Sequence, residues 1–214
     1  MRTVQRGFTL VEIAIVLVII GLLLGGILKG QEMITQAKIK NSIADFSGIS
    51  AAYHGYQDRY RSIPGDDLGA TRWSGAVAGT GDGVLTGKYN SSTDTDESRK
   101  WWDHLRRAGF VAGSGYQQPF NPFTGIIGVQ TGDGAATPAS VLDGMIGLLI
   151  CSAAIPDKVA IALDTQMDDG LIDKGNVRAQ KQGGTNPDIV TTIPAGDKPY
   201  AETGGNTYTL CRAL

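Results

Sequence analysis

The sequence predicts an α+β protein in which one long N-terminal helix packs on a globular head with an antiparallel β-sheet. Three observations predict this class: an apolar run at residues 8–28, helical spacing of apolar residues up to residue 62, and short apolar segments separated by turns after residue 125. The expected divisions are a leader at 1–7, a transmembrane helix at 8–28, its amphipathic continuation at 29–62 and a head at 63–214.

The apolar run at residues 8–28 is long enough to cross a membrane, since a helix of this length spans about 30 Å. A short basic leader with Arg2 and Arg6 precedes it, and Gly7 is the small residue at the junction. An ordinary secretory signal is cut after its apolar region. A cut after Gly7 would instead remove the basic leader and keep the hydrophobic helix in the mature protein.

Glu12 places a carboxylate inside this apolar run, where an unpaired charge is costly. A cut after Gly7 would create an α-amino cation on Phe8, only four residues away. In a staggered assembly the amine of a neighbouring copy would meet Glu12 directly. The alternatives are a lipid-exposed defect and a transmembrane glutamate of no special role.

Four glycines, Gly21, Gly25, Gly26 and Gly30, interrupt the helix near the outer membrane boundary and form two small-xxx-small pairs. Such pairs allow close helix packing in a membrane. Local unwinding is the alternative, because an internal glycine weakens a helix by about 1 kcal/mol relative to alanine. Both interpretations remain open at this point.

Beyond the apolar run the helix becomes amphipathic and is expected to end before Pro64 and Gly65. Its apolar positions recur at spacings of three and four: Ile39, Ile43, Phe46, Ile49, Tyr53, Tyr56 and Tyr60. A short helix is predicted at residues 98–108, with Trp101 in the core and His104 on the surface. After residue 125 some apolar segments are expected to be strands, and residues 156–163 a helix.

Cys151 and Cys211 lie in apolar or strand-like segments, 60 residues apart. In a domain exported across a membrane, an even cysteine count predicts a disulfide. Two buried free thiols are the alternative. A bridge would attach the C-terminal strand to the head.

An acid-rich segment is the one candidate for metal binding: Asp164, Asp168, Asp169 and Asp173. Calcium prefers carboxylate and carbonyl oxygens, but the spacing lacks the order of an EF-hand and its closing glutamate. Asp-Asp-Gly is also a favourable turn. We therefore expect a turn and no resident cofactor, with calcium as the alternative.

No other pattern indicates catalysis or nucleic-acid binding. The segment GTGDG at residues 79–83 is a weak candidate for a phosphate loop, because no strand-turn-helix frame surrounds it. The two histidines, His54 and His104, have no nucleophile placed beside them in the sequence. A net charge of −2 gives no support for a nucleic-acid partner.

The segment GFTLVEIAIVLVIIGLLLGG resembles the processing site and first helix of type IV pilins and type II secretion pseudopilins. The resemblance covers about residues 6–30, and Phe8, Thr9, Leu10 and Glu12 match the family pattern. It implies cleavage between Gly7 and Phe8 by a prepilin peptidase, methylation of the Phe8 amine, and recruitment of the next subunit through Glu12. Pilins of this family often close a C-terminal loop with a disulfide.

The resemblance implies a structural subunit rather than an enzyme. Its expected partners are further copies, other pilins, the prepilin peptidase and methyltransferase, an inner-membrane assembly platform and membrane lipid. The precursor would lie in the bacterial inner membrane with its head outside the cytoplasm, and later in an extracellular pilus or a periplasmic pseudopilus. A pilus subunit is favoured by the cysteine pair; a secretion pseudopilin and a membrane-tethered binding protein are the alternatives.

Overall fold

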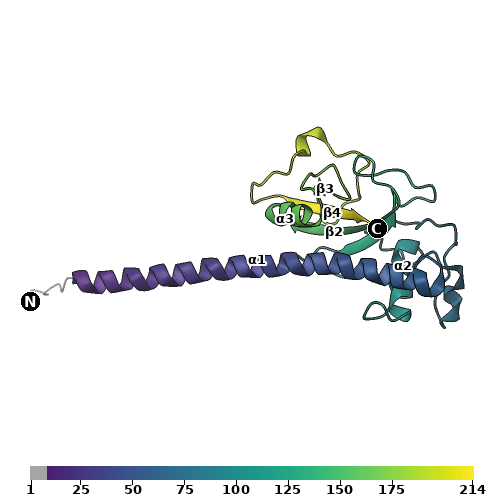
Figure 1. Cartoon of the computed structure of the whole chain (residues 1–214), viewed down its shortest axis with the longest axis horizontal. Coiled ribbons are helices and arrows are strands. Elements are labelled where there is room, and N and C mark those ends of the chain that lie inside the picture. The colour runs from purple at the N-terminus through teal and green to yellow at the C-terminus, as the bar shows by residue number, and fades with distance from the viewer. Residues whose placement is uncertain (1–8) are drawn as a thin grey trace, which may run out of the picture. The chain divides into compact units, whose positions relative to one another are not determined.

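The computed structural model describes residues 9–214, so the predictions for Gly7 and Phe8 fall outside the described residues. The described chain divides into two compact units, one up to Lys38 and one from Ile39 to Leu214, and helix α1 (Leu10–Tyr60) runs through the boundary between them. The second unit holds a four-stranded antiparallel sheet, so the predicted α+β class is confirmed (Figure 1). Helix α1 ends close to its predicted end at residue 62.

The first unit is the apolar part of α1. Its most apolar window has a mean hydropathy of 2.8, and none of that window is buried. The apolar side chains are exposed from Leu10 to Ile34. Helix α1 is therefore long and apolar enough to cross a membrane, and its apolar surface is available to lipid or to other proteins.

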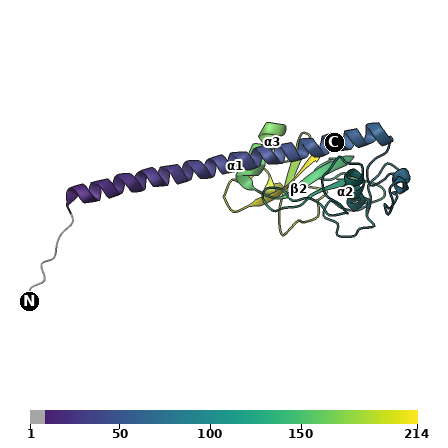
Figure 2. The same cartoon turned by 90° about the horizontal axis from the view of Figure 1, so that it is seen from below.

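In the second unit, α1 buries one face of its remaining turns. Ile39, Phe46, Ile49 and Tyr56 are buried at the helical spacing that the sequence predicts. Helix α2 (Glu97–Arg107) lies beside the last turns of α1, as Figure 2 shows. There the ring of Tyr53 stacks on that of Trp101, with 5.4 Å between the ring centroids.

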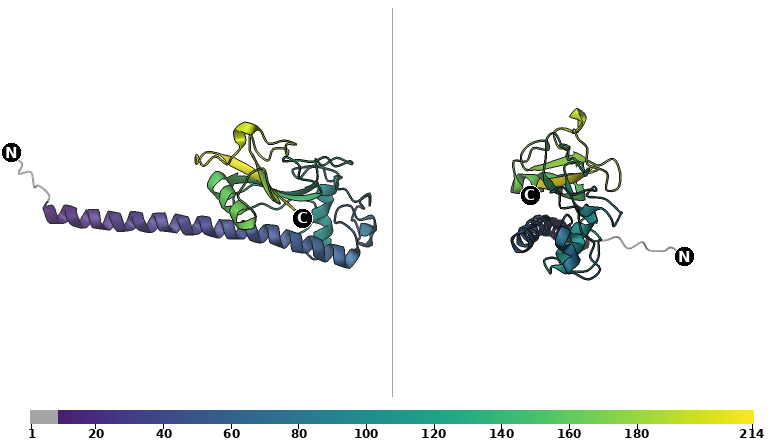
Figure 3. Two further views of the ribbon diagram at one scale, coloured as in Figure 1. Left: turned by 45° about the horizontal axis from the view of Figure 1, so that its top comes forward. Right: turned by 90° about the vertical axis from the view of Figure 1, so that its right-hand side faces the viewer.

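The sheet has the order β1-β2-β4-β3, and each neighbouring pair of strands is antiparallel. Strands β1 (Ile127–Thr131), β2 (Leu148–Pro156) and β4 (Thr207–Ala213) lie in segments that the sequence predicts as strands. Strand β3 (Val177–Lys181) was not predicted, because its alternation of apolar and polar residues is short. Helix α3 (Asp157–Met167) lies against the sheet, as Figure 3 shows.

The two faces of the sheet carry different cores, because successive strand residues point to opposite faces. One face packs on the helices: Ile150 and Leu210 join Phe46, Trp102 and Leu163 in a single apolar cluster. The opposite face is covered by loops, where Tyr89, Leu142, Met145 and Ile193 pack on Leu149, Cys151 and Cys211. The sheet is thus buried on both sides, although helices cover only one of them.

The prediction that His104 lies on the surface was wrong, since its side chain is fully buried in α2. Its Nδ1 accepts a hydrogen bond from the Gly65 N–H at 2.8 Å, and its Nε2 lies 2.9 Å from the Val77 carbonyl oxygen. Burial lowers the pKa of His104, and a neutral ring with its proton on Nε2 satisfies both contacts. Loops that start more than twenty residues earlier cover this face of α2, which the local sequence pattern does not reveal.

The predicted disulfide between Cys151 and Cys211 is confirmed. The two residues pair directly across β2 and β4, with 4.0 Å between their Cα atoms. The described residues contain no free cysteine. The bridge attaches the C-terminal strand to the middle of the sheet, on the face that loops cover.

We expect the double variant Cys151→Ala, Cys211→Ala to lower the free energy of unfolding of the head by about 4 kcal/mol, from the chain entropy of a loop of this length. Membrane insertion should not change, because the bridge lies far along the chain from the apolar part of α1. Urea unfolding of the full-length protein in detergent measures the loss. An unchanged unfolding midpoint would contradict the assigned role of the bridge.

Candidate functional site

The first turn of α1 contains a capping box formed by Thr9 and Glu12. The backbone N–H and the hydroxyl of Thr9 both donate to Glu12 Oε2 at 2.8 Å, and the Glu12 N–H lies 3.3 Å from Thr9 Oγ1. A Thr-x-x-Glu pattern at a helix start satisfies backbone N–H groups that have no partner within the helix. The sequence contains this spacing, although the capping box was not among the predictions.

Only one oxygen of the Glu12 carboxylate takes part in this box. Among the described residues, Oε1 accepts no hydrogen bond and Glu12 forms no ion pair. A carboxylate has lone pairs on both oxygens. Glu12 can therefore fix the start of the helix and still bind a cation from outside its own chain.

No close contact within the described chain requires glycine at the four predicted positions of α1. The helix is continuous through Gly21, Gly25, Gly26 and Gly30. A Cβ atom added to any of them would meet no described atom within 4 Å. Their predicted role in close packing or local unwinding thus concerns contacts with other molecules, and it stays a prediction.

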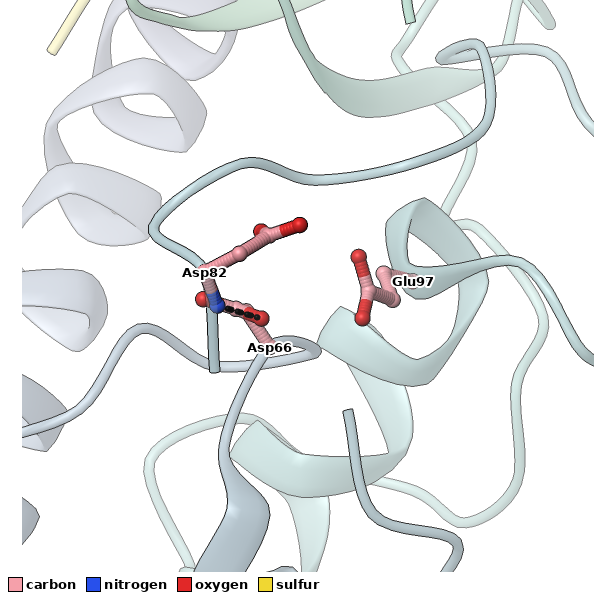
Figure 4. Close-up of side chains that lie close together, drawn as sticks. All are labelled: Asp66, Asp82 and Glu97. Carbon is pink, nitrogen blue, oxygen red and sulfur yellow. Dashed lines mark hydrogen bonds between the residues drawn. The ribbon is translucent and has the colours of Figure 1, made fainter. Parts of the chain in front are cut away.

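A second cluster of carboxylates, which was not predicted from the sequence, contains Asp66, Asp82 and Glu97. Their carboxylate oxygens lie within 4.8 Å of one another (Figure 4). Asp66 accepts hydrogen bonds from the backbone N–H groups of Gly81, Asp82 and Gly83. The dashed line in Figure 4 marks the bond from Asp82, which is 3.2 Å long.

Glu97 holds the two ends of the same loop. Its Oε1 accepts from the Thr80 N–H at 2.7 Å, and its Oε2 accepts from the Thr86 N–H at 3.0 Å. The glycine-rich segment at residues 79–83 therefore does present converging N–H groups, as a phosphate loop would. Their anion is the protein's own Asp66 carboxylate, so the segment is a structural loop in this chain.

The acid-rich segment after α3 is only partly brought together. Asp164, Asp168 and Asp169 lie with carboxylate oxygens within 4.8 Å of one another, whereas Asp173 forms an ion pair with Lys198 at 3.1 Å. Three carboxylates at this distance could hold a cation such as calcium. Each also accepts a hydrogen bond from the protein, including the Tyr200 hydroxyl on Asp164 at 2.7 Å.

Asp164 is the buried member of this cluster. Burial raises its pKa to about 6, and the nearby charges of Asp169 and Asp168 act in the same direction. Hydrogen bonds from Tyr200 and Gly170 lower the pKa without cancelling the effect of burial. The folded head therefore binds the Asp164 proton more tightly than the unfolded chain, in which an aspartate titrates near pH 4.

We expect the Asp164 contribution to stability to be present below about pH 4 and lost as the pH rises to about 6, because only the unfolded chain has released the proton in that range. The loss is on the order of 2 kcal/mol. Asp164→Asn should remove this part of the pH dependence. Urea unfolding of both proteins at pH 4 and pH 7, in the presence of a chelator, measures it.

A difference in stability between the wild type and Asp164→Asn that is the same at both pH values would contradict this assignment. A parallel series with calcium chloride tests the cation alternative. A cation bound by the three carboxylates would stabilise the wild type at pH 7 and leave Asp164→Asn unaffected.

Comparison with known proteins identifies one feature of the chain. Residues 2–28 match the model of the prokaryotic N-terminal methylation motif. A comparison with curated proteins gave no significant match. The motif and the apolar helix fit a precursor that is anchored in the inner membrane. Together they support a likeness of the N-terminal segment to that of type IV pilins and pseudopilins, which are structural subunits.

Proposed function

We propose that this chain is a structural subunit of a type IV pilus-like filament, cleaved after Gly7 and polymerised through α1. The observation that carries the proposal is the Glu12 carboxylate, which lies at the start of an exposed apolar helix and keeps one oxygen free of partners among the described residues. An anchor that held the head as a single copy would have no use for a carboxylate at this depth.

The charge of Glu12 would act on a neighbouring copy. Cleavage after Gly7 gives each copy an α-amino group on Phe8, and that of a neighbour can approach the free Oε1. Within lipid the attraction between opposite charges is stronger than in water, and each charge is costly alone. The pair would therefore set the axial offset between copies at four residues, or about 6 Å of helix.

The remaining partners follow from this role. Processing would require a prepilin peptidase and methyltransferase, and polymerisation an inner-membrane assembly platform. The apolar side chains of the first unit would contact lipid before assembly and other copies or other pilins afterwards. No step of this proposal requires a cofactor.

A pilus subunit is preferred to a secretion pseudopilin because the disulfide joins the C-terminal strand to the sheet, as pilins with a closed C-terminal loop do. A pseudopilin that drives protein export is the second candidate, and the processing site suits both. A secretin encoded among the neighbouring genes would favour the pseudopilin. A retraction motor and adhesion genes would favour the pilus.

We expect Glu12→Ala and Glu12→Gln to insert and to be cleaved but to reduce assembled filament at least tenfold. A tenfold effect corresponds to a loss of about 1.4 kcal/mol per contact. Glutamine keeps an oxygen that can accept from Thr9, so this variant separates the charge from the capping box. Electron microscopy of sheared filaments and a blot for cleaved subunit in the membrane measure the two steps.

Thr9→Ala is the matched control, because it removes the Thr9 hydroxyl from the capping box and leaves the carboxylate and the backbone N–H of residue 9 in place. We expect it to retain most of the filament. Wild-type filament levels in Glu12→Gln, or a loss in Thr9→Ala equal to that in Glu12→Ala, would show that Glu12 acts only within its own helix.

Replacing Gly7 with leucine should block processing. A peptidase that cuts between Gly7 and Phe8 fits a residue without a side chain at position 7, and the leucine side chain would not fit there. The precursor would then remain in the membrane, heavier by residues 1–7. Intact-mass spectrometry distinguishes the two forms. Normal trimming in Gly7→Leu would refute the assigned processing site, and Gly21→Leu serves as a control for bulk added elsewhere in the apolar segment.

A further inference from the structure

The second unit contains an apolar groove of about 280 Å³ between α1 and the segment that follows α2. Its lining includes the buried residues Ile49, Trp102 and Ile127. Phe110 and Phe120 line it as well and keep exposed surface, and Phe120 is 62% exposed. Small-molecule sites begin at about 300 Å³. The groove therefore has the size for a small molecule with an apolar body.

The walls of the groove are fixed by packing within the second unit. Gly48 keeps the α1 side open, since an added Cβ would meet no described atom within 4 Å. Two turns further along α1, Gly55 lets the ring of Phe110 approach the helix, because a Cβ there would lie 2.7 Å from Phe110 Cε1. The Phe110 ring also contacts that of Tyr56, with 6.4 Å between the ring centroids. The groove thus exists before any ligand binds.

Asp45 is the one charged residue that lines this groove. It is half-buried, and it forms no ion pair or hydrogen bond with any residue that the structure describes. Burial raises the pKa of the Asp45 carboxyl above its ordinary value. A carboxylate that is partly removed from water without a partner favours a nearby cation.

The neighbours of Asp45 on α1 do not supply that cation. The positions one turn before and one turn after it on the helix are uncharged: Asn41, Ser42, Gly48 and Ile49. The other residues that line the groove are uncharged as well. The positive charge that Asp45 favours would therefore come from a bound ligand.

The lining also restricts what kind of cation fits. A metal ion such as calcium needs several oxygen ligands, and Asp45 is the only lining residue with an oxygen in its side chain. An ammonium group suits the groove better, because the faces of the Phe110 and Phe120 rings attract cations. A neutral apolar ligand would remove more water from Asp45 without giving it a partner.

We propose that this groove binds a small organic cation, an ammonium group on an apolar body, with the ammonium group paired with Asp45 and the apolar body against Phe110 and Phe120. The site lies within the second unit and does not depend on filament assembly. It would give the head a ligand in addition to the contacts that α1 makes in the proposed function.

Two probes of matched size test the proposal on the wild type. 2-Phenylethylamine carries the ammonium group, and 2-phenylethanol has a neutral hydroxyl in its place. Full-length ¹⁵N-labelled protein in an uncharged maltoside detergent is titrated with each probe at about pH 7, where an alkylamine is protonated. The amine should bind roughly tenfold more tightly than the alcohol and shift the backbone N–H signals of Asp45, Gly48 and Phe120.

Variants then separate the charge from the shape of the groove. Asp45→Asn should weaken amine binding roughly tenfold and leave alcohol binding unchanged. Asp58→Asn is the matched control, since it neutralises an exposed acidic residue of the same helix outside the groove, and it should change neither. Phe120→Ala should weaken both probes, because it removes an exposed wall. Thermal unfolding verifies that each variant is folded.

Equal affinity of the wild type for the two probes, or binding of neither at millimolar concentration, would overturn the proposal. Wild-type affinity for the amine in folded Asp45→Asn would also overturn it, as would shifts confined to residues outside the groove. The comparison of the two probes on the wild type needs no variant, so it decides the question even where a variant fails to fold.

Discussion

Apolar surface has to be removed from water, and the two parts of helix α1 differ in what can cover theirs. From Ile39 onward its apolar face is buried with Phe46 and Ile49 in the core beneath the sheet. From Leu10 to Ile34 its apolar side chains are exposed. A surface of this extent is not stable in water, so this part requires a membrane or other apolar helices. In the proposed function, lipid covers this apolar surface before assembly, and other α1 helices cover it in the filament.

Carboxylates accept hydrogen bonds from several backbone N–H groups that have no partner in a helix or sheet. Glu12 serves the first turn of α1, Asp66 serves the glycine-rich loop, and Glu97 holds both ends of that loop. Hydrogen bonds from N–H groups to a charged acceptor are stronger than those between neutral groups. Glu12 differs from the other two because it lies in the exposed apolar unit and has an oxygen free among the described residues, which is why we assign it a partner outside the chain.

Features that depend on local patterns could be predicted from the sequence alone. The apolar run follows from its length, the amphipathic face with Phe46 from helical spacing, and the strand around Cys151 from an apolar segment between turns. The capping box of Thr9 and Glu12 was also readable from its spacing. By contrast, the bonds from the glycine-rich loop to Asp66 join segments at least fifteen residues apart, and His104 is buried by distant loops. Contacts of this kind depend on tertiary packing, which local patterns do not encode.

The central claim is that the Phe8 amine of one copy meets the Glu12 carboxylate of the next. Solid-state NMR on filaments tests it directly, with ¹⁵N at the Phe8 amine in half of the subunits and ¹³C at the Glu12 carboxylate in the other half. The account predicts dipolar coupling between the two labels at ion-pair distance, within about 4 Å. Absence of that coupling in well-ordered filaments would contradict it.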